Sequence, residues 1–226
     1  MIVAVFSLKI KNNVLSRSSH QGYVPNFGGV VFFISYFSVF FLIPEFRASN
    51  TTFVLLAAMA VIFVTGFLDD LIALSPKLKL VGQLVSVTIV LVEPQLTIHS
   101  LHGFLGVYEI PFFYSIIGTV FFLVLLINAF NLIDGIDGLT AITGIVISVF
   151  YSLVFLKASQ FLFFAICMTN IAMLLAFLRY NFSKSKKIFM GDTGSLLLGL
   201  VLGILTIKIM SLDLMALNTF SFPQRK

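Results

Sequence analysis

Residues 51–70 read TTFVLLAAMAVIFVTGFLDD, in which eighteen uncharged residues are followed by two adjacent carboxylates, Asp69 and Asp70. A transmembrane helix needs about 20 mainly apolar residues, so this run is long enough to cross a bilayer. The whole chain has the same character, since 59% of its 226 residues are hydrophobic, only 10% are charged, and the mean hydropathy is +1.10. A soluble domain carries about 25% charged residues. The composition therefore predicts an all-α polytopic membrane protein.

Further apolar runs along the chain predict a single transmembrane domain over residues 1–226, built as a bundle of about seven to eight helices. The third run is short and carries Gln83, so we expect that helix to be kinked or shielded from lipid by its neighbours. The opening residues 1–8 are apolar without a cleavage site, and we expect them to end a first helix rather than form a signal peptide. The seven expected spans are Phe27–Phe46, Thr51–Leu68, Leu78–Val92, Pro111–Ile127, Leu139–Leu156, Phe161–Leu178 and Ser195–Met210.

The stretch Glu93–Ile110 has a different pattern. Short β-branched and aromatic runs surround Gly103 and Gly106, which predicts a small hairpin between the third and fourth spans. We interpret His99 and His102 as ordinary polar residues of this hairpin rather than as ligands.

Basic residues set the orientation. Three loops on one side of the predicted bundle hold nine of the fourteen lysines and arginines, and the positive-inside rule makes that side cytoplasmic and the hairpin outward-facing. The net charge of +5 therefore reflects membrane orientation and contact with lipid phosphates, not nucleic-acid binding. A single cysteine, Cys167, rules out an internal disulfide and a cysteine zinc cluster. The nine cations are Lys9, Lys11, Arg17, Lys77, Lys79, Arg179, Lys184, Lys186 and Lys187.

Asp69 and Asp70 form the first of three acidic clusters on this side. Two carboxylates at the C-terminal end of a helix oppose the helix dipole and repel each other, and they are costly inside a bilayer. A structural role for both is difficult to find, although Asp70 capping the next segment, or simple solvation, is the alternative. The pair therefore points to function.

The second cluster is the stretch NAFNLIDGIDGL, residues 128–139. Asn128 and Asn131 are three residues apart, as are Asp134 and Asp137, so each pair would share a face of a helical turn. Glycines beside Asp137 allow a ligand to approach the backbone. The alternative is an ordinary turn rich in Asp and Gly.

The third cluster is KKIFMGDTGS, residues 186–195, at the start of the last span. Asp192 and Thr193 lie between two glycines, and either residue would also suit a plain helix N-cap. Carboxylates without Cys or His favour a hard cation such as Mg²⁺, with Mn²⁺ as a second candidate, and lysines and Arg179 would hold phosphates. The three clusters together predict displacement at a diphosphate.

These motifs resemble the polyprenyl-phosphate N-acetylhexosamine-1-phosphate transferase family over nearly the whole chain. The resemblance rests on Ser19-His20 with the following VPNFGG, on Asp69-Asp70, on NAFNLIDGIDGL and on FMGDTGS. It implies transfer of a sugar-1-phosphate from a UDP-sugar to undecaprenyl phosphate at the bacterial inner membrane, with release of UMP. The second motif is similar to the GlcNAc-1-phosphate branch, which initiates cell-envelope polysaccharides including lipopolysaccharide.

The resemblance also assigns roles to individual residues. Asp192 is implied as the main Mg²⁺ ligand, and Asp69 and Asp70 would act on the lipid phosphate, by deprotonating it or by helping to place the metal. Direct attack by the lipid phosphate is preferred over a covalent intermediate on an aspartate. The implied substrate-binding residues are Asn128, Asn131, Asp134, Asp137, Asn181, Lys187 and His20, the last of which would equally suit a solvated loop.

Several alternatives stay open. The chain would be a shortened family member, because the family continues with further helices and a His- and Arg-rich cytoplasmic loop. The peptidoglycan branch, which uses UDP-MurNAc-pentapeptide, is the close alternative, and a non-catalytic remnant or a proton-coupled transporter is the distant one. Sequence does not fix the oligomeric state, and a homodimer is left open.

Overall fold

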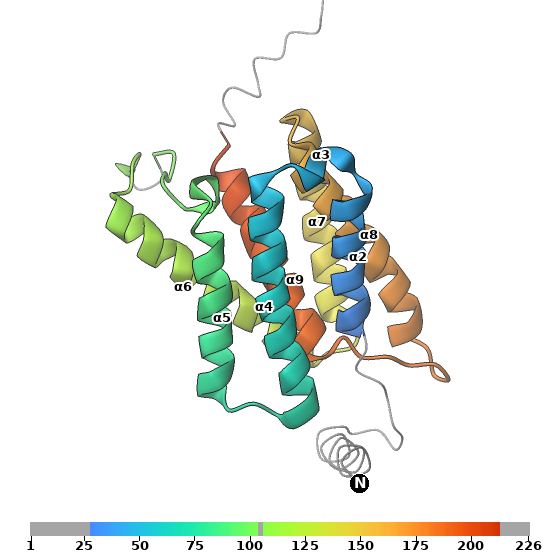
Figure 1. Cartoon of the computed structure of the whole chain (residues 1–226). Helices are drawn as coiled ribbons and strands as arrows, with labels where there is room; N and C mark the ends of the chain where they lie inside the picture. The colour runs from blue at the N-terminus through green and yellow to red at the C-terminus, as the bar shows by residue number, and fades with distance from the viewer. Residues whose placement is uncertain (1–27, 104–105, 213–226) are drawn as a thin grey trace, which may run out of the picture.

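The computed structural model describes residues 28–103 and 106–212, and within these ranges it is all-α, as predicted (Figure 1). Eight α-helices and one short 3₁₀ helix lie in the described part of the chain. They are α2 (Gly28–Leu42), α3 (Pro44–Arg47), α4 (Asn50–Ile72), α5 (Pro76–Val90), η1 (Pro94–Leu96), α6 (Phe112–Ile133), α7 (Leu139–Lys157), α8 (Phe161–Asn181) and α9 (Gly191–Met210).

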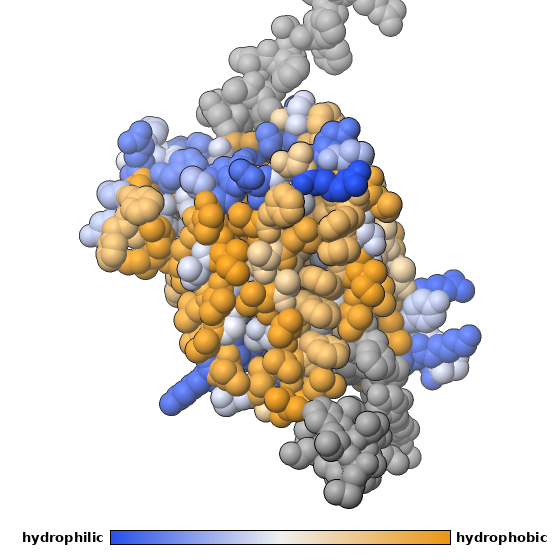
Figure 2. Space-filling model, in the orientation of Figure 1, coloured by the Kyte–Doolittle hydropathy of each residue, from blue (hydrophilic) through white to orange (hydrophobic). Residues whose placement is uncertain are grey.

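Five of these helices, α4, α6, α7, α8 and α9, are long and apolar enough to cross a membrane. The protein is therefore a multi-pass membrane protein. Of the other two predicted spans, α2 has 15 residues and is shorter than the predicted Phe27–Phe46, whereas α5 has 15 residues, the length predicted for the short third run. The span predicted over Phe27–Phe46 stops at Leu42, since Pro44 lacks an N–H and disfavours helix in the residue before it. Figure 2 shows apolar side chains over the middle of the visible face and hydrophilic ones at both ends.

Helix α9 is the centre of the bundle. It packs against α2, α4, α6 and α7, and 83% of the residues in its most apolar 18-residue stretch are buried inside the protein. A helix that is apolar on every side can lie in a protein core or face lipid, and α9 is of the first kind, since residues 196–205 are all buried. Its N-terminus lies at the end of the bundle where α4 meets α5. The side chains of its first turn, Asp192 and Thr193, are therefore held between several helices.

Glycines allow α2 and α4 to approach the first turn of α9. A Cβ on Gly66 would lie 2.6 Å from the Thr193 Cα, and one on Gly29 would lie 2.3 Å from the Gly194 nitrogen. The start of α2 is also bonded to the segment before α9, because Gly28 and Gly29 donate their N–H groups to the carbonyls of Phe189 and Met190. The VPNFGG motif thus ends in a packing contact.

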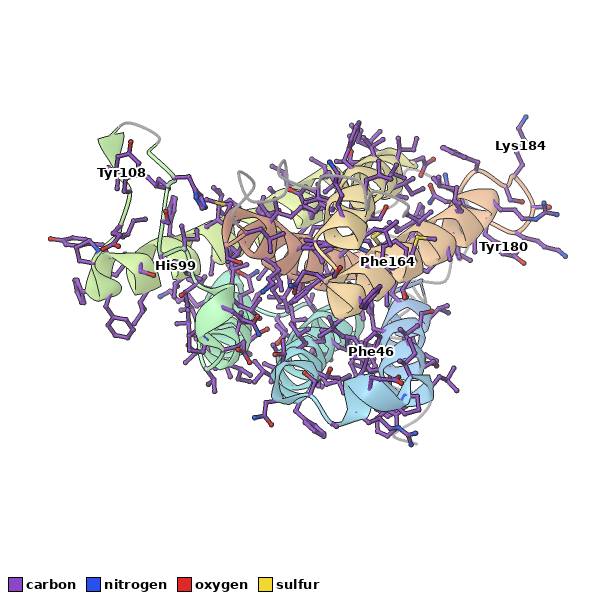
Figure 3. All side chains as sticks on the ribbon, turned by 90° about the horizontal axis from the view of Figure 1, so that it is seen from above. Phe46, His99, Tyr108, Phe164, Tyr180 and Lys184 are labelled. Atoms are coloured by element: carbon purple, nitrogen blue, oxygen red, sulfur yellow. The ribbon has the colours of Figure 1, made fainter. Side chains whose placement is uncertain are left out.

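The hairpin predicted over Glu93–Ile110 is a chain reversal without strands in its described residues. Ile110 donates its N–H to the His99 carbonyl at 2.9 Å, but His102, Gly103 and Gly106 all have positive φ, which interrupts extended structure. The prediction of strand-like runs was therefore wrong. Seen from above in Figure 3, His99 and Tyr108 lie at one lateral edge of the bundle, and Tyr180 and Lys184 lie at the other.

The connections α4–α5, α6–α7 and α8–α9 lie at the same end of the bundle, the lower end in Figure 1. The prediction that the loops at Asp69, Asn128 and Arg179 share one side is therefore confirmed. We call this the acidic end. The residues His20, Lys9, Lys11 and Arg17, and the first residue of the Phe27–Phe46 span, lie outside the described residues.

Replacing Gly66 with alanine tests the close contact between α4 and α9. The added methyl group would press on the backbone of Asp192 and Thr193, so Gly66→Ala should lower the free energy of unfolding by about 1–3 kcal/mol. The matched control is Gly118→Ala in α6, where a Cβ meets no atom within 4 Å and alanine should be neutral or mildly stabilising. Thermal unfolding in detergent measures both, and equal melting temperatures would contradict the prediction.

Candidate functional site

Asp192 lies in the first turn of α9, where the helix dipole favours a negative charge. Its Oδ1 accepts a hydrogen bond of 2.5 Å from the Nδ2 of Asn131, which also donates to the Ser195 hydroxyl at 2.9 Å. Its Oδ2 lies 3.4 Å from the ammonium of Lys79. The carboxylate is therefore oriented by α6 on one side and by α5 on the other.

Lys79 connects the three acidic clusters. Its Nζ lies 2.9 Å from Asp69 Oδ2 and donates to Asn131 Oδ1 at 3.1 Å, in addition to its contact with Asp192. One ammonium thus serves two carboxylates, which leaves this group with a net negative charge. The sequence analysis counted Lys79 among the orienting cations and gave lysines a general phosphate-binding role, but it did not pair Lys79 with any of these groups. The short connection between α4 and α5, residues 73–75, was the signal in the sequence that could have predicted this pairing. It folds α5 back along α4 and brings Lys79 opposite Asp69.

Asp70 caps α9 from another helix. Its Oδ1 accepts the N–H of Asp192 at 2.9 Å, and its Oδ2 accepts the N–H of Thr193 at 2.9 Å and the Thr193 hydroxyl at 2.5 Å. The N-cap residue Met190 supplies no such bond, so Asp70 takes the place of an N-cap side chain. A structural role for this carboxylate therefore exists. It is the cap of a helix far along the chain, and not of the next segment.

The second cluster is divided between a helix and a turn. Asn128 and Asn131 lie on one face of the last turns of α6, as their spacing predicted. Asp134 is the C-cap of α6, and Asp137 lies in the turn before α7, where Gly138 has a φ of 75°. The expectation that Asp134 and Asp137 share a helical face was therefore wrong, because the chain leaves the helix at Asp134.

Asp134 is largely buried and surrounded by negative charge. Its removal from water, followed by the charges of Asp192 and Asp70, raises the pKa of the Asp134 carboxyl to about 8. The buried Thr140 hydroxyl is close enough to favour the ionised form weakly, but it forms no hydrogen bond of normal geometry in the described structure. Asp134 thus has carboxylates for neighbours and forms no ion pair with a cation in residues 28–103 and 106–212.

The loop between α8 and α9 brings in the remaining predicted residues. The ammonium of Lys187 pairs with Asp137, whose side chain is 45% exposed, and lies 5.3 Å from the centre of the Phe189 ring. Asn181 is buried and donates its Nδ2 to the Ile188 carbonyl at 3.0 Å, while its Oδ1 has no partner in the described part of the chain. Asn181 therefore braces this loop, and its contact with a nucleotide stays a prediction.

No set of three His, Cys, Asp or Glu side chains in residues 28–103 and 106–212 is arranged to hold a metal ion. The donor set nevertheless fits a hard cation, since it consists of carboxylate and amide oxygens and has more negative than positive charge. Of the two residues predicted as ligands, Asp192 directs Oδ2 toward Lys79 and lies beside the Asp69 carboxyl, whereas both oxygens of Asp70 are engaged in the cap. Asp192 and the nearby Asp134 are better placed than Asp70.

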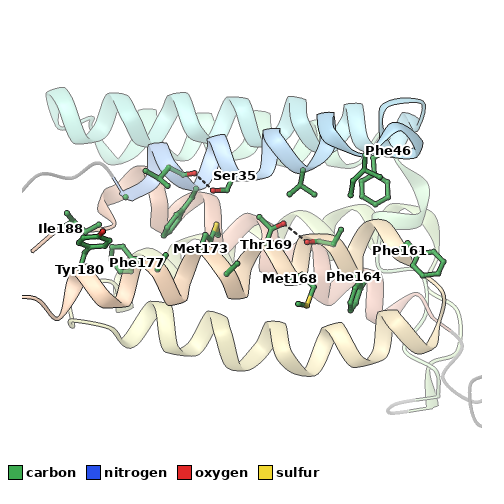
Figure 4. Close-up of a pocket in the computed structure, with 18 of the residues that line it drawn as sticks. Ser35, Phe46, Phe161, Phe164, Met168, Thr169, Met173, Phe177, Tyr180 and Ile188 are labelled. Atoms are coloured by element: carbon green, nitrogen blue, oxygen red, sulfur yellow. Dashed lines mark hydrogen bonds between the residues drawn. The ribbon is translucent and has the colours of Figure 1, made fainter.

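Two apolar grooves open on the sides of the bundle. The larger, about 1100 Å³, lies between α2 and α8 and contains the hydroxyls of Ser35 and Thr169, which bond back to carbonyls of their own helices (Figure 4). It lacks the charged centre described above. The smaller, about 550 Å³, lies between α5 and α6 and reaches Asn128. Of these two grooves, the α5/α6 groove reaches a polar residue of the second cluster, Asn128, whereas the larger one reaches the acidic end at Tyr180 and Ile188.

Replacing Asp70 with asparagine tests the cap on α9. The variant keeps the size of the side chain but loses the charge and one acceptor, so Asp70→Asn should lower the free energy of unfolding by about 1.5–3 kcal/mol. The control is Asp137→Asn, which removes only an exposed ion pair and should change stability by less than about 1 kcal/mol. Chemical denaturation in detergent compares them, and similar midpoints would remove the capping role.

The raised pKa of Asp134 predicts a pH-dependent stability in metal-free buffer. Between its ordinary pKa of 3.8 and about 8, the folded chain holds a proton that the unfolded chain releases. Stability should therefore fall as the pH rises through this window, by at most about 1.4 kcal/mol per pH unit. Asp134→Asn should be less dependent on pH than the wild type. Denaturation midpoints in EDTA across this window measure the effect, and equal slopes would contradict it.

Comparison with known proteins identifies the family of this chain. The family model "Glycosyl transferase family 4" matches residues 52–210. The chain is 35% identical over 199 residues to the phospho-N-acetylmuramoyl-pentapeptide-transferase of Enterococcus hirae, which covers 82% of this chain and 61% of that protein. It is 33% identical over 194 residues to the "Probable undecaprenyl-phosphate N-acetylglucosaminyl 1-phosphate transferase" of Bacillus subtilis (strain 168), covering 85% of this chain and 53% of that protein.

The chain thus spans between 53% and 61% of the length of these two relatives. The match includes every acidic-end residue discussed above from Asp69 to Asp192. The chain therefore belongs to glycosyl transferase family 4, the membrane family of polyprenyl-phosphate N-acetylhexosamine-1-phosphate transferases.

Proposed function

We propose that this chain transfers GlcNAc-1-phosphate from UDP-GlcNAc to undecaprenyl phosphate, releasing UMP, at the cytoplasmic face of the bacterial plasma membrane. The observation that carries the proposal is the meeting of Asp69, Asp192 and Asn131 on one ammonium, that of Lys79. Helices α4, α6 and α9 supply these three groups, and α5 supplies Lys79, all at one end of a membrane bundle. A centre of this kind suits a diphosphate held between water and lipid. The product would initiate a cell-envelope polysaccharide.

In the proposed reaction, an oxygen of the lipid phosphate attacks the phosphorus that carries the sugar. The bond between this phosphorus and the oxygen bridging it to UMP breaks, UMP leaves with the bonding electrons, and a lipid diphosphate sugar is formed. A phosphate monoester has a second pKa of about 6, so the nucleophile is largely ionised at neutral pH. Direct attack therefore needs positioning more than it needs a strong base.

The residues of the site would share this work. Lys79 would neutralise charge on the phosphates, and Asn131 would orient Asp192. Bound Mg²⁺, or Mn²⁺ in its place, would neutralise the diphosphate further, with Asp192 and Asp134 as its nearest carboxylates. Asp69 would face the lipid phosphate, and Asp70 would place Asp192 through the cap on α9. Asn128, Asp137, Asn181 and Lys187 would border the nucleotide.

The α5/α6 groove supports a lipid acceptor. It is lined by Ile116, Val120, Phe121 and other apolar residues, and it ends at Asn128. An isoprenoid chain could lie in this groove with its phosphate at the acidic end. Because the isoprenoid chain comes from the hydrocarbon of the bilayer, the groove would contribute packing contacts and orientation and not burial from water.

The close alternative is transfer of phospho-MurNAc-pentapeptide. It is favoured by the relative from Enterococcus hirae, whose identity of 35% is similar to the 33% of the relative from Bacillus subtilis. The same centre would serve both reactions, because the two donors differ in the sugar and not in the diphosphate. The donor specificity therefore belongs to residues that contact the sugar.

The experiment is a measurement of UMP release in detergent with undecaprenyl phosphate, Mg²⁺ and either UDP-GlcNAc or UDP-MurNAc-pentapeptide. We expect release with UDP-GlcNAc, loss of release in EDTA, and a decrease of at least about 100-fold for Asp192→Asn. The control Glu109→Gln removes an exposed carboxylate at the opposite end and should retain full activity.

The other outcomes separate the alternatives. Release with UDP-MurNAc-pentapeptide alone would assign the chain to the peptidoglycan branch. Binding of UDP-sugar without release would favour a non-catalytic role. Substrate-driven proton uptake in proteoliposomes without UMP would favour a transporter. Turnover of Asp192→Asn equal to that of the wild type would remove Asp192 from the proposed site.

A further inference from the structure

We propose that Gln83, in the middle of α5, is a positioning residue that holds the end of α6 in register with the acidic centre. We use this name for the group formed by Asp69, Lys79, Asn131 and Asp192. This inference rests on the proposed function, because it concerns the alignment of Asn131 for that reaction. Gln83 is 1% exposed, although it lies in an apolar membrane helix. A buried carboxamide there is unfavourable unless both its donor and its acceptor are satisfied.

The partner of Gln83 is the side chain of Asn128. Gln83 donates its Nε2 to Asn128 Oδ1 at 3.2 Å, and Asn128 returns a bond of 2.8 Å from its Nδ2 to Gln83 Oε1. Asn128 Nδ2 also donates to the Val124 carbonyl of its own helix at 2.8 Å. The two carboxamides therefore fix each other's orientation, and the Asn128 end is tied to the backbone of α6.

This pair is the first of two polar links between α5 and α6. The second lies one turn nearer the acidic end, where Lys79 donates to Asn131 Oδ1 at 3.1 Å. Lys79 and Gln83 are four residues apart on α5, and Asn128 and Asn131 are three apart on α6, so each helix presents its two polar groups on one face. The links are thus two successive rungs between the same helices.

Above these rungs the two helices separate. Figure 1 shows α6 inclined away from α5 toward the opposite end of the bundle, and the α5/α6 groove lies in the gap, lined by Leu84 and Val124 next to the Gln83–Asn128 pair. The two helices therefore diverge from the Gln83–Asn128 pair toward the end of the bundle opposite the acidic end. Helix α6 itself packs closely on α9, where a Cβ on Gly199 would lie 2.8 Å from the Ile127 Cα. The directional hydrogen bonds of the Gln83–Asn128 pair therefore fix α5, and with it Lys79, relative to the end of α6.

The consequence for the site passes through Asn131. This residue bonds to Lys79, Asp192 and Ser195 at once, and a small rotation or shift of α6 would break at least one of these bonds. The Gln83–Asn128 pair limits both movements, since it lies one turn away on the same helix. Gln83 contacts no group of the acidic centre itself, so it acts through Asn128 and α6.

The test uses four variants of the full chain. Gln83→Leu removes both hydrogen bonds, and Gln83→Glu keeps an acceptor for Asn128 but loses the donor. The double variant Gln83→Asn with Asn128→Gln exchanges the two carboxamides and preserves their combined length. The matched control is Ser86→Ala, which removes a buried hydrogen bond from α5 to the Ala58 carbonyl of α4 and leaves α6 untouched.

Kinetics of UMP release provide the first readout. We expect Gln83→Leu and Gln83→Glu to lower kcat by about tenfold or more, with KM for the UDP-sugar changed by less than about threefold. The exchanged pair is compared with the wild type by the distance measurement, because Asn128 also borders the proposed nucleotide site. Ser86→Ala should lower the melting temperature without lowering kcat, which separates positioning from general stability.

The second readout does not depend on activity. Spin labels at Leu80→Cys and Leu132→Cys, both exposed, report the distance between α5 and the end of α6 in a Cys167→Ser background. Gln83→Leu should broaden the distance distribution, and the exchanged pair should restore it. If wild type releases no UMP, the proposed transfer fails, and the distance measurement alone decides the role of Gln83.

Two results would overturn the proposal. One is a Gln83→Leu variant with the distance distribution of the wild type. The other is an exchanged pair whose distance distribution is as broad as that of the single variants. If Gln83→Leu does not insert, Gln83→Glu and the exchanged pair provide the same comparison.

Discussion

The cap that Asp70 places on the N-terminus of α9 is the interaction on which the rest of the structure depends. The first turn of a helix has N–H groups without partners inside the helix, and here that turn is enclosed by α2 and α4. Asp70 satisfies two of these groups and the Thr193 hydroxyl. Without such a partner, the central helix of the bundle could not begin at this depth.

The same turn carries Asp192, so the structural contact also positions the candidate reactive group. Gly29 and Gly66 allow neighbouring backbones to come close, which leaves the Asp192 side chain directed toward α5 and α6. Two aspartates adjacent in sequence therefore have different tasks. Asp70 holds a helix, and Asp69 joins the charged centre through Lys79.

The charges in this centre do not balance. Lys79 is shared by two carboxylates, and Asp134 has the charges of Asp192 and Asp70 nearby but no ion pair within the part of the chain that the structure describes. Removing an unpaired carboxylate from water is unfavourable, and the structure relieves this cost by raising the pKa of Asp134. A divalent cation or a protonated Asp134 would each resolve the imbalance, which links the electrostatics of the fold to its proposed chemistry.

The amino-acid sequence by itself determined the class of fold, the shared side of the acidic loops and the family, because apolar run length, loop charge and local motifs are properties of short segments. It did not determine that Asp70 caps a helix 122 residues away, that Lys79 joins the clusters, or that Gln83 pairs with Asn128. It also misjudged the helical face of Asp134 and Asp137 and the strands of the hairpin, where single backbone angles at Gly138 and His102 decide the path. These features depend on which side chains meet when helices pack, and only the tertiary structure brings distant segments within hydrogen-bonding distance.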